Sequence, residues 1–176
     1  MSTAASQPVS DPLAIVVMGV SGAGKTTVGR ALAEALRAEF IDGDDLHSAA
    51  ARAKMAAGHA LNDDDRWPWL DRVGAALAGR ERRIVAASAL KRAYRDRIRL
   101  RAGPVLRFVY LFAESSAIRA RVAARPGHYM PASLVDSQFA TLEPPRDEPD
   151  VIAWPAGADL QISLASLVEA IGKLGL

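Results

Sequence analysis

The sequence contains no cysteine among its 176 residues. Disulfide frameworks, thiolate zinc sites and cysteine nucleophiles are therefore all excluded. Long hydrophobic runs are also missing: the longest strongly apolar stretch covers residues 13–20 and is interrupted by Gly19. Because a helix that crosses a bilayer needs about 20 apolar residues, an integral membrane protein is excluded and no membrane partner is expected.

The amino-terminal segment lacks the pattern of a secretory signal. Residues 1–12 contain no basic residue and no apolar core. We expect a flexible tail over residues 1–12, followed by one domain over residues 13–176, since this length is typical of a single domain. Together with the lack of cysteine, this pattern predicts a cytoplasmic location.

Lysine is scarce, because only four of the 22 basic residues are lysine and the others are arginine. The formal net charge is +2, an excess too small to require nucleic acid, and no nucleic-acid partner is expected. A guanidinium presents a planar fork that fits phosphate and carboxylate oxygens, so the arginines are consistent with small anionic ligands. A genome rich in G and C, which favours alanine and arginine, would explain most of them as well.

Short apolar runs alternate with helical patterns along the chain. The runs predict strands over residues 13–18, 39–41, 83–87, 105–112 and 159–162. Apolar residues at helical spacing predict helices over residues 27–38, 49–57, 64–79, 91–101, 115–124, 131–142 and 164–174. This alternation predicts an α/β fold, with a parallel sheet that helices cover on both faces. The polar, proline-rich stretch 143–150 predicts a surface loop.

The most specific motif lies between the first predicted strand and helix. It fits G-x-x-x-x-G-K-[ST] with Gly19, Val20, Ser21, Gly22, Ala23, Gly24, Lys25 and Thr26. In such a loop the backbone N–H groups surround phosphate oxygens, Lys25 reaches the β- and γ-phosphates, and the Thr26 hydroxyl can bind Mg²⁺. The motif predicts a nucleotide site but leaves open an acceptor kinase or a switch or motor NTPase.

Acidic residues follow the second predicted strand, at an edge where open α/β sheets bind ligands. With Gly43 between them, Asp42 and Asp44 can point the same way. One could hold Mg²⁺ through water while the other accepts a hydroxyl proton. A solvated turn that caps the next helix explains these residues equally well, with Asp45 as the better cap.

The third predicted strand ends in Ala87 and Ser88, where many P-loop proteins carry an acidic residue that organises a metal. The carboxylates after the second strand are therefore the remaining candidates for organising a metal and accepting a proton. Arg66, beside the acidic helix start at residues 61–65, could pair internally or bind an anion.

Three arginines near a Pro-Gly turn at residues 126–127 predict a mobile lid over the phosphates: Arg119, Arg121 and Arg125. A solvated helix face is the alternative for these side chains.

Read in order with the phosphate loop, four segments resemble the gluconate kinase (gluconokinase) family of small P-loop kinases, which is related to shikimate kinases. These segments are FIDGDDLH (40–47), LNDDDRWPWL (61–70), SALKRAYRDRIR (88–99) and RPGHYMPASLVDSQFATLEP (125–144). The resemblance covers about residues 15–143. It implies a single-domain P-loop kinase fold with a five-stranded parallel sheet in the order 2-3-1-4-5. It also implies ATP-dependent phosphorylation of D-gluconate to 6-phospho-D-gluconate, with ATP and Mg²⁺.

The resemblance also implies roles for individual residues. By similarity Asp42 helps to hold Mg²⁺ through water, beside the Thr26 hydroxyl of the phosphate loop, and Asp44 orients or deprotonates the acceptor hydroxyl. Lys25, Asp44 and Arg125 are then the catalytic residues. Arg121 joins the phosphate loop in binding ATP. Gluconate contacts are expected from Asp44, His47, Arg66, Lys91 and Arg95.

Alternatives to gluconate kinase activity are a P-loop kinase for another small hydroxy acid and a regulatory nucleotide-binding NTPase. The segment Ser88-Ala89-Leu90 argues against shikimate, since shikimate kinases are expected to have a glycine-rich turn there. The sequence leaves a homodimer possible.

Overall fold

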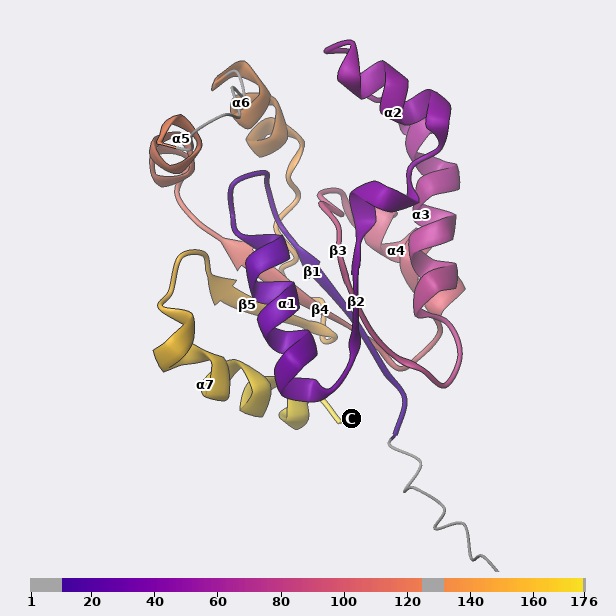
Figure 1. The fold of residues 1–176 in the computed structure, drawn as a ribbon, viewed down its shortest axis with the longest axis vertical. Helices are drawn as coiled ribbons and strands as arrows, with labels where there is room; N and C mark the ends of the chain where they lie inside the picture. Colours follow the sequence, from indigo (N-terminus) through magenta and orange to yellow (C-terminus); the bar gives the residue numbers. More distant parts are fainter. Residues whose placement is uncertain (1–10, 125–131, 176) are drawn as a thin grey trace, which may run out of the picture.

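Five parallel strands form the centre of the computed structural model, which describes residues 11–124 and 132–175 (Figure 1). The strands are β1 (Leu13–Met18), β2 (Glu39–Asp42), β3 (Arg82–Ala86), β4 (Leu106–Phe112) and β5 (Val151–Pro155). Their order in the sheet is β2-β3-β1-β4-β5, and every neighbouring pair is parallel. This confirms the expected α/β class and the strand order 2-3-1-4-5.

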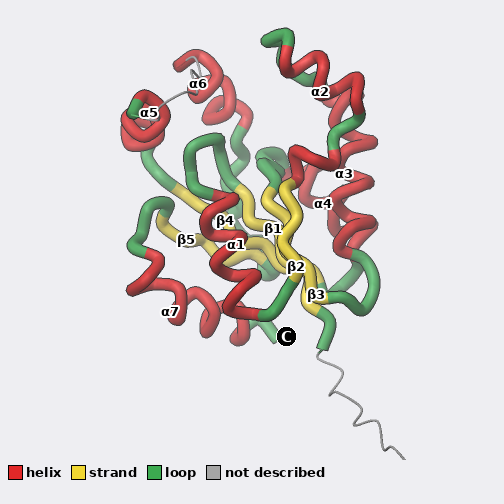
Figure 2. Tube along the Cα trace, in the orientation of Figure 1, coloured by secondary structure: helices red, strands yellow, loops and turns green. Residues whose placement is uncertain are grey.

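Helices cover both faces of this sheet, as the alternating pattern predicts (Figures 1 and 2). They are α1 (Lys25–Leu36), the short 3₁₀ helix η1 (Gly43–Leu46), α2 (Ala49–Ala56), α3 (Asp63–Leu77), α4 (Arg92–Ala102), α5 (Ser115–Ala123), α6 (Ala132–Thr141) and α7 (Leu160–Lys173). Helices α1 and α7 pack on one face, and α3 and α4 on the other. In Figure 1, α2 on one side and α5 and α6 on the other stand beyond the carboxyl ends of the strands.

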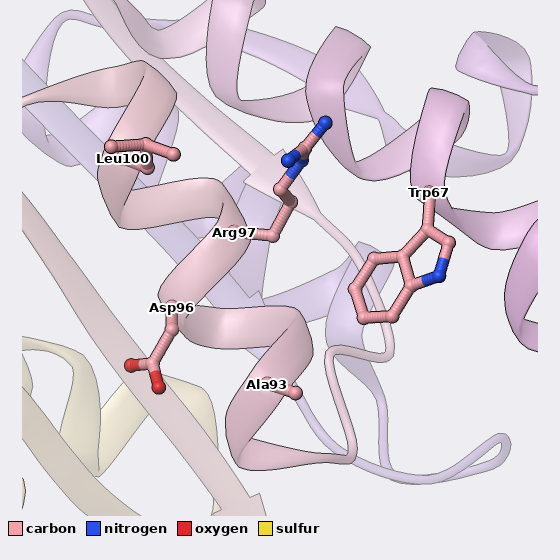
Figure 3. Close-up of a pocket in the computed structure, with 5 residues that line it drawn as sticks. All are labelled: Trp67, Ala93, Asp96, Arg97 and Leu100. Carbon is pink, nitrogen blue, oxygen red and sulfur yellow. The ribbon is translucent and has the colours of Figure 1, made fainter.

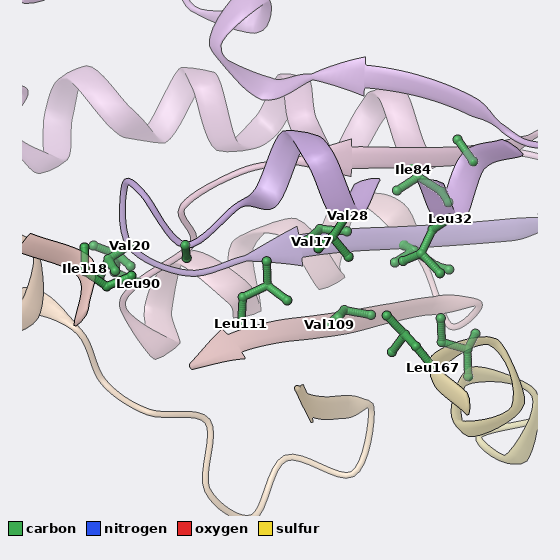
Figure 4. Packing of buried hydrophobic residues seen from close by; sticks show 14 of the residues in the cluster. Val17, Val20, Val28, Leu32, Ile84, Leu90, Val109, Leu111, Ile118 and Leu167 are labelled. Atoms are coloured by element: carbon green, nitrogen blue, oxygen red, sulfur yellow. The ribbon is translucent and has the colours of Figure 1, made fainter. Parts of the chain in front are cut away.

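The strand β1 is buried on both of its faces. Successive side chains of a strand point to opposite sides, so Leu13, Ile15 and Val17 join the core under α1 and α7, while its other residues join the core under α3 and α4. Figure 4 shows Val17 close to Val28 and Leu32 of α1. Burial on both faces explains why this strand reads as a continuous apolar run.

The predicted fifth strand is wrong. Residues 159–162 begin α7, whose first turn is capped by the Asp159 side chain as it accepts the Gln161 N–H (2.9 Å). The fifth strand is β5, which lies at an edge of the sheet and is only partly buried. Val151 to Trp154 are all apolar, but the run is short and ends in Pro155, which argues against a strand. Pro155 is tolerated because an edge strand pairs on one side only.

Residues 143–150 contain no helix or strand, as predicted, but the expected position on the surface is wrong for part of the segment. Glu148 is only 8% exposed. Its carboxylate accepts hydrogen bonds from Arg95 of α4, so this loop is anchored to the helix layer.

Close packing of α3 against α4 depends on Gly74. A Cβ atom at this position would lie 2.5 Å from Arg101 Cβ and 2.9 Å from the Ile98 carbonyl oxygen. Both neighbours belong to α4, so a side chain here would push the two helices apart.

We therefore expect Gly74→Ala to lower the free energy of unfolding by about 1–3 kcal/mol through overpacking. The matched control is Gly172→Ala in α7, where a Cβ meets nothing within 4 Å and alanine is the better helix former by about 0.5–1 kcal/mol. Denaturant unfolding of both variants measures the difference. A Gly74→Ala protein as stable as the Gly172→Ala protein would contradict this account of the interface.

Candidate active site

The phosphate loop joins β1 to α1, in the strand-loop-helix context that its motif requires. Gly24 caps α1 with φ +94°, a left-handed conformation that glycine adopts without strain. The Gly19 N–H donates to the Ser88 carbonyl oxygen (3.3 Å), which ties the loop to the segment after β3. The amino-terminal end of α1 therefore faces the carboxyl edge of the sheet, where its dipole favours an anion.

The two residues predicted to hold Mg²⁺ lie next to each other. Thr26 Oγ1 donates to Asp42 Oδ2 (3.4 Å), and Asp42 Oδ1 accepts the Asp44 N–H (3.1 Å). This turn lies so close to the end of β3 that a Cβ at Gly43 would collide with the Ala86 carbonyl oxygen. The glycine thus allows Asp42 and Asp44 to meet the phosphate loop.

Lys25 faces the same two carboxylates. Its ammonium donates to the Val20 carbonyl oxygen (3.1 Å). Burial lowers the pKa of Lys25 to about 8, although the charges of Asp44 and Asp42 partly oppose the shift. The structure therefore brings together one cation and two carboxylates beside the phosphate loop.

A second group of polar side chains, here called the acceptor-side cluster, consists of Asp63, Arg66, Lys91 and Tyr94. Lys91 Nζ donates to both Asp63 oxygens (3.0 and 2.9 Å), and the Tyr94 hydroxyl donates to the same carboxylate. Arg66 Nη1 donates to the Tyr94 hydroxyl (3.1 Å) and lies 3.9 Å from Asp63 Oδ1. Hydrogen bonds from Tyr94 and Lys91 lower the pKa of Asp63, and Asp63 raises that of Lys91.

The start of α3 positions this cluster. Asn62 Oδ1 accepts the Asp65 N–H and Asp65 Oδ2 accepts the Asn62 N–H, both at 2.9 Å, which is a capping box that fixes the first helical turn. Asp63 and Arg66 are three residues apart and therefore share one side of the helix.

His47 lies between the Asp44 turn and α3. Its ring stacks on Trp69 with the centroids 4.5 Å apart and the planes 8° from parallel, and Trp69 Nε1 donates to the Gly43 carbonyl oxygen (2.7 Å). Burial lowers the pKa of His47 below its usual value, which favours the neutral form of the ring. Its buried Nδ1 has no hydrogen-bond partner among the described residues. Asp45, the predicted cap, does not cap α2; the Ser48 hydroxyl does. Asp42 caps the short helix η1 by accepting the Asp44 N–H.

The structure does not bring Arg95 into this site, although the sequence predicts that it contacts gluconate. The side chain is 1% exposed. All of its hydrogen bonds go to Glu148 and to the Ala89 and Leu90 carbonyl oxygens. All three nitrogens of the guanidinium are bonded within the protein, and the side chain is too enclosed to meet a ligand beside the phosphate loop.

Helix α5 packs against the phosphate loop, where the nearest side chains to Gly22 are Val122 and Ile118. Arg121 extends from α5 to the turn after β5, where it donates to the Ala156 carbonyl oxygen (2.8 Å). Arg119 pairs with Asp136 of α6. Arg125 and the Pro-Gly turn of the predicted lid lie outside the described residues.

Comparison with known proteins identifies the family of this chain. A family model described as an AAA domain matches residues 15–145. The thermoresistant gluconokinase of Escherichia coli (strain K12) is 42% identical over 163 residues, which cover 90% of this chain and 93% of that protein. The chain belongs to the gluconokinase family. A probable gluconokinase of Schizosaccharomyces pombe is 47% identical over 78% of this chain and 76% of that protein.

A solved structure of a family member has the same fold. The crystal structure of a gluconokinase from Sinorhizobium meliloti 1021 matches with a TM-score of 0.82 and 45% identity, over 94% of this chain and 98% of that one. As a family of P-loop kinases, these proteins use ATP. No helix within residues 11–124 or 132–175 of this family member is long and apolar enough to cross a membrane.

Sequence reasoning missed several residues that shape the site. Gln138 of α6 accepts the Ser21 N–H with Oε1 (2.6 Å) and donates to the Ser21 hydroxyl (3.0 Å), so α6 touches the phosphate loop. Asp63, Tyr94 and Trp69 were also missed as individual residues. All four lie inside the segments that carry the family resemblance, which was the one available signal.

A shallow hollow on the outside of α3 and α4 lies apart from this chemistry. Figure 3 shows the residues that line it, which are Trp67, Ala93, Asp96, Arg97 and Leu100. None of them is a predicted site residue. Trp67 packs against one member of the acceptor-side cluster, with its ring edge-on to Tyr94 and the centroids 5.6 Å apart.

The lowered pKa of Lys25 predicts that ATP binding weakens as the pH rises through about 8. Only the protonated ammonium attracts phosphate, so the dissociation constant should increase by at most about tenfold per pH unit above the pKa. Calorimetric titration of ATP between about pH 7.5 and 9.5 measures this dependence. In the Lys25→Arg control the charge persists throughout this range, and its affinity for ATP should stay constant. Equal pH dependence of both proteins would refute the assignment.

Proposed function

We propose that this chain transfers the γ-phosphoryl group of ATP to D-gluconate, giving 6-phospho-D-gluconate and ADP. The observation that supports this proposal is that the phosphate loop and the acceptor-side cluster both lie at the carboxyl edge of the sheet. The phosphate loop with Lys25 lies beside the Asp42–Asp44 turn, and His47, close enough for the Asp44 charge to act on it, stacks on α3 of the acceptor-side cluster. The relatives at 37–47% identity that are called gluconokinases or probable gluconokinases support the same reaction.

The nucleotide half of the site is the phosphate loop. Backbone N–H groups and the start of α1 hold the β- and γ-phosphates, and the Lys25 ammonium offsets the negative charge that moves to the leaving oxygen. Arg121 and Arg125 contribute further positive charge on the ATP side in this proposal.

Mg²⁺ fits the oxygen pair formed by Thr26 and Asp42. A hydroxyl and a carboxylate are hard donors, and Mg²⁺ in kinases takes one or two protein oxygens beside water and phosphate. Because these two oxygens lie 3.4 Å apart, both can serve one ion. When bound, the ion neutralises charge on the phosphates.

The acceptor half of the site binds the negatively charged sugar acid with positively charged side chains. Arg66 and Lys91 bind the gluconate carboxylate, and His47 and Asp44 bind its hydroxyls. The oxygen of the terminal hydroxyl attacks the γ-phosphorus as the bond to the ADP oxygen breaks, and the hydroxyl proton passes to the Asp44 carboxylate. Arg95 has no part in this contact set, since it is enclosed in the protein.

A cytoplasmic location, the lack of a nucleic-acid partner and a homodimer stay predictions. So does the division into a tail over residues 1–12 and a domain over residues 13–176.

A coupled assay that detects ADP tests the function. With ATP and Mg²⁺ present, we expect turnover with D-gluconate and at least about tenfold lower kcat/KM with shikimate, nucleoside monophosphates and other aldonates, since each differs from gluconate in its charge, in its number of hydroxyls or in their configuration. The control is ATP alone. Turnover that is independent of any acceptor would favour a regulatory NTPase instead.

The two carboxylates should respond differently to substitution. Asp44→Asn removes the proton acceptor, so kcat should fall by about 10²–10⁴-fold with little change in the KM for gluconate. Asp42→Asn weakens the affinity for Mg²⁺, so excess Mg²⁺ should restore part of its activity.

Asp45→Asn is the matched control, because Asp45 is exposed and adjacent in sequence and has no assigned role; it should behave as the unmodified protein does. Initial rates across Mg²⁺ concentrations provide the measurement. Rescue of Asp44→Asn by metal, without rescue of Asp42→Asn, would reverse the two assignments.

A further inference from the structure

The turn formed by residues 88–91 connects β3 to α4 and touches both halves of the site. At one end the Ser88 carbonyl oxygen accepts the Gly19 N–H of the phosphate loop (3.3 Å). At the other end Lys91 is bound to Asp63 in the acceptor-side cluster. The conformation of this turn therefore determines where Lys91 lies relative to the phosphate loop.

The turn contains a strained residue. Ala89 is completely buried and has φ +44°. This left-handed conformation costs a residue with a Cβ about 1–2 kcal/mol. Such a conformation persists only where the surroundings hold it. The contacts of its carbonyl group show what holds it here.

Arg95 supplies those contacts from α4. Its Nη1 donates to the Ala89 and Leu90 carbonyl oxygens, both at 3.1 Å. The rest of the guanidinium is bound to Glu148, through Nε (2.9 Å to Oε2) and Nη2 (2.5 Å to Oε1). The planar fork of arginine makes all of these bonds at once, which a lysine ammonium cannot do.

Glu148 is in turn held as a carboxylate. Burial alone would raise its pKa, but hydrogen bonds from Arg95 and Arg99 lower the pKa below the usual value. Arg99 Nη2 lies 2.6 Å from its second oxygen. Glu148 therefore holds the Nε and Nη2 side of the Arg95 guanidinium, and Nη1 on the other side points to the two carbonyl oxygens of the turn.

A contribution to stability alone is a poor explanation for this pair. The side chains of Arg95 and Glu148 are 1% and 4% exposed. Burying two charges costs desolvation energy that their attraction offsets only in part, so buried ion pairs add little net stability. The pair instead fixes a backbone conformation, because the hydrogen bonds of Arg95 constrain the carbonyl groups of the 88–91 turn.

We propose that Arg95 and Glu148 are positioning residues for the acceptor site: they hold the 88–91 turn in the left-handed conformation that places Lys91 in the acceptor-side cluster. The proposal rests on the role assigned above to Lys91 in binding the sugar acid. Neither residue touches substrate; both act through the carbonyl groups of Ala89 and Leu90.

The same two segments provide a matched control. Arg99 of α4 also pairs with Asp150, with Nε 2.8 Å from Oδ2. This ion pair joins α4 to the segment before β5, as the Arg95–Glu148 pair does, but neither of its members contacts the 88–91 turn. Asp150→Asn therefore weakens the anchoring of the segment without releasing the turn.

The test is a double-mutant cycle with Glu148→Gln, Lys91→Ala and the two combined, scored by the KM values for gluconate and ATP and by thermal unfolding. We expect Glu148→Gln to raise the KM for gluconate by about tenfold or more, as for a charged hydrogen bond that is lost, and the KM for ATP by less than about twofold. Both changes act through Lys91. In a protein that already carries Lys91→Ala, the further change Glu148→Gln should therefore raise the KM for gluconate by less than about twofold. Asp150→Asn should leave both KM values unchanged.

Additive effects in the cycle, or a change in KM for Asp150→Asn equal to that for Glu148→Gln, would overturn the proposal and leave the pair a purely structural role. If Lys91→Ala itself does not change the KM for gluconate, the assigned role of Lys91 fails instead. Should Glu148→Gln not fold, Arg95→Lys takes its place, since it keeps the buried charges balanced but cannot bond both carbonyl groups and the carboxylate; a KM for gluconate unchanged in that variant also refutes the proposal.

Discussion

The burial of β1 between two layers of helices is the constraint on which the site depends. This strand lies between β3 and β4, and all six of its side chains are buried. Its position cannot shift without opening both halves of the core, since protein interiors are close-packed. The phosphate loop begins at the next residue and is therefore attached to the most constrained strand of the fold.

Paired charge is the second feature that organises the site. Lys25 faces Asp42 and Asp44, and Lys91 and Arg66 surround Asp63. Lys25, Lys91 and Arg66 thus each have a carboxylate neighbour within the protein. These neighbours hold the cations in place at the sheet edge, so that phosphate and the sugar-acid carboxylate meet charges whose orientation is fixed beforehand.

Local patterns were sufficient for the features that depend on neighbours in sequence. The phosphate loop, the central strands and the turn from Asp42 to Asp44 were predicted because each is encoded within a few residues. The edge strand β5 was missed, although Val151 to Trp154 are apolar, because the run is short and ends in Pro155, which argues against a strand. The role of Arg95 depends on Glu148, which is 53 residues away, and no spacing rule connects them. One signal was present, since Arg95 lies three residues before the buried Ile98 and thus on the inner face of α4.

The close contact at Gly43 has a consequence for how acceptor preference can change in proteins of this architecture. No side chain fits between this residue and the Ala86 carbonyl group, so the backbone of the turn that carries Asp42 and Asp44 has a fixed shape. The groups assigned to the sugar acid at the start of α3 are side chains, and they can be substituted without moving that turn. Divergence toward a different hydroxy acid would therefore be confined to the acceptor-side cluster, while the turn assigned to the transfer stays constant.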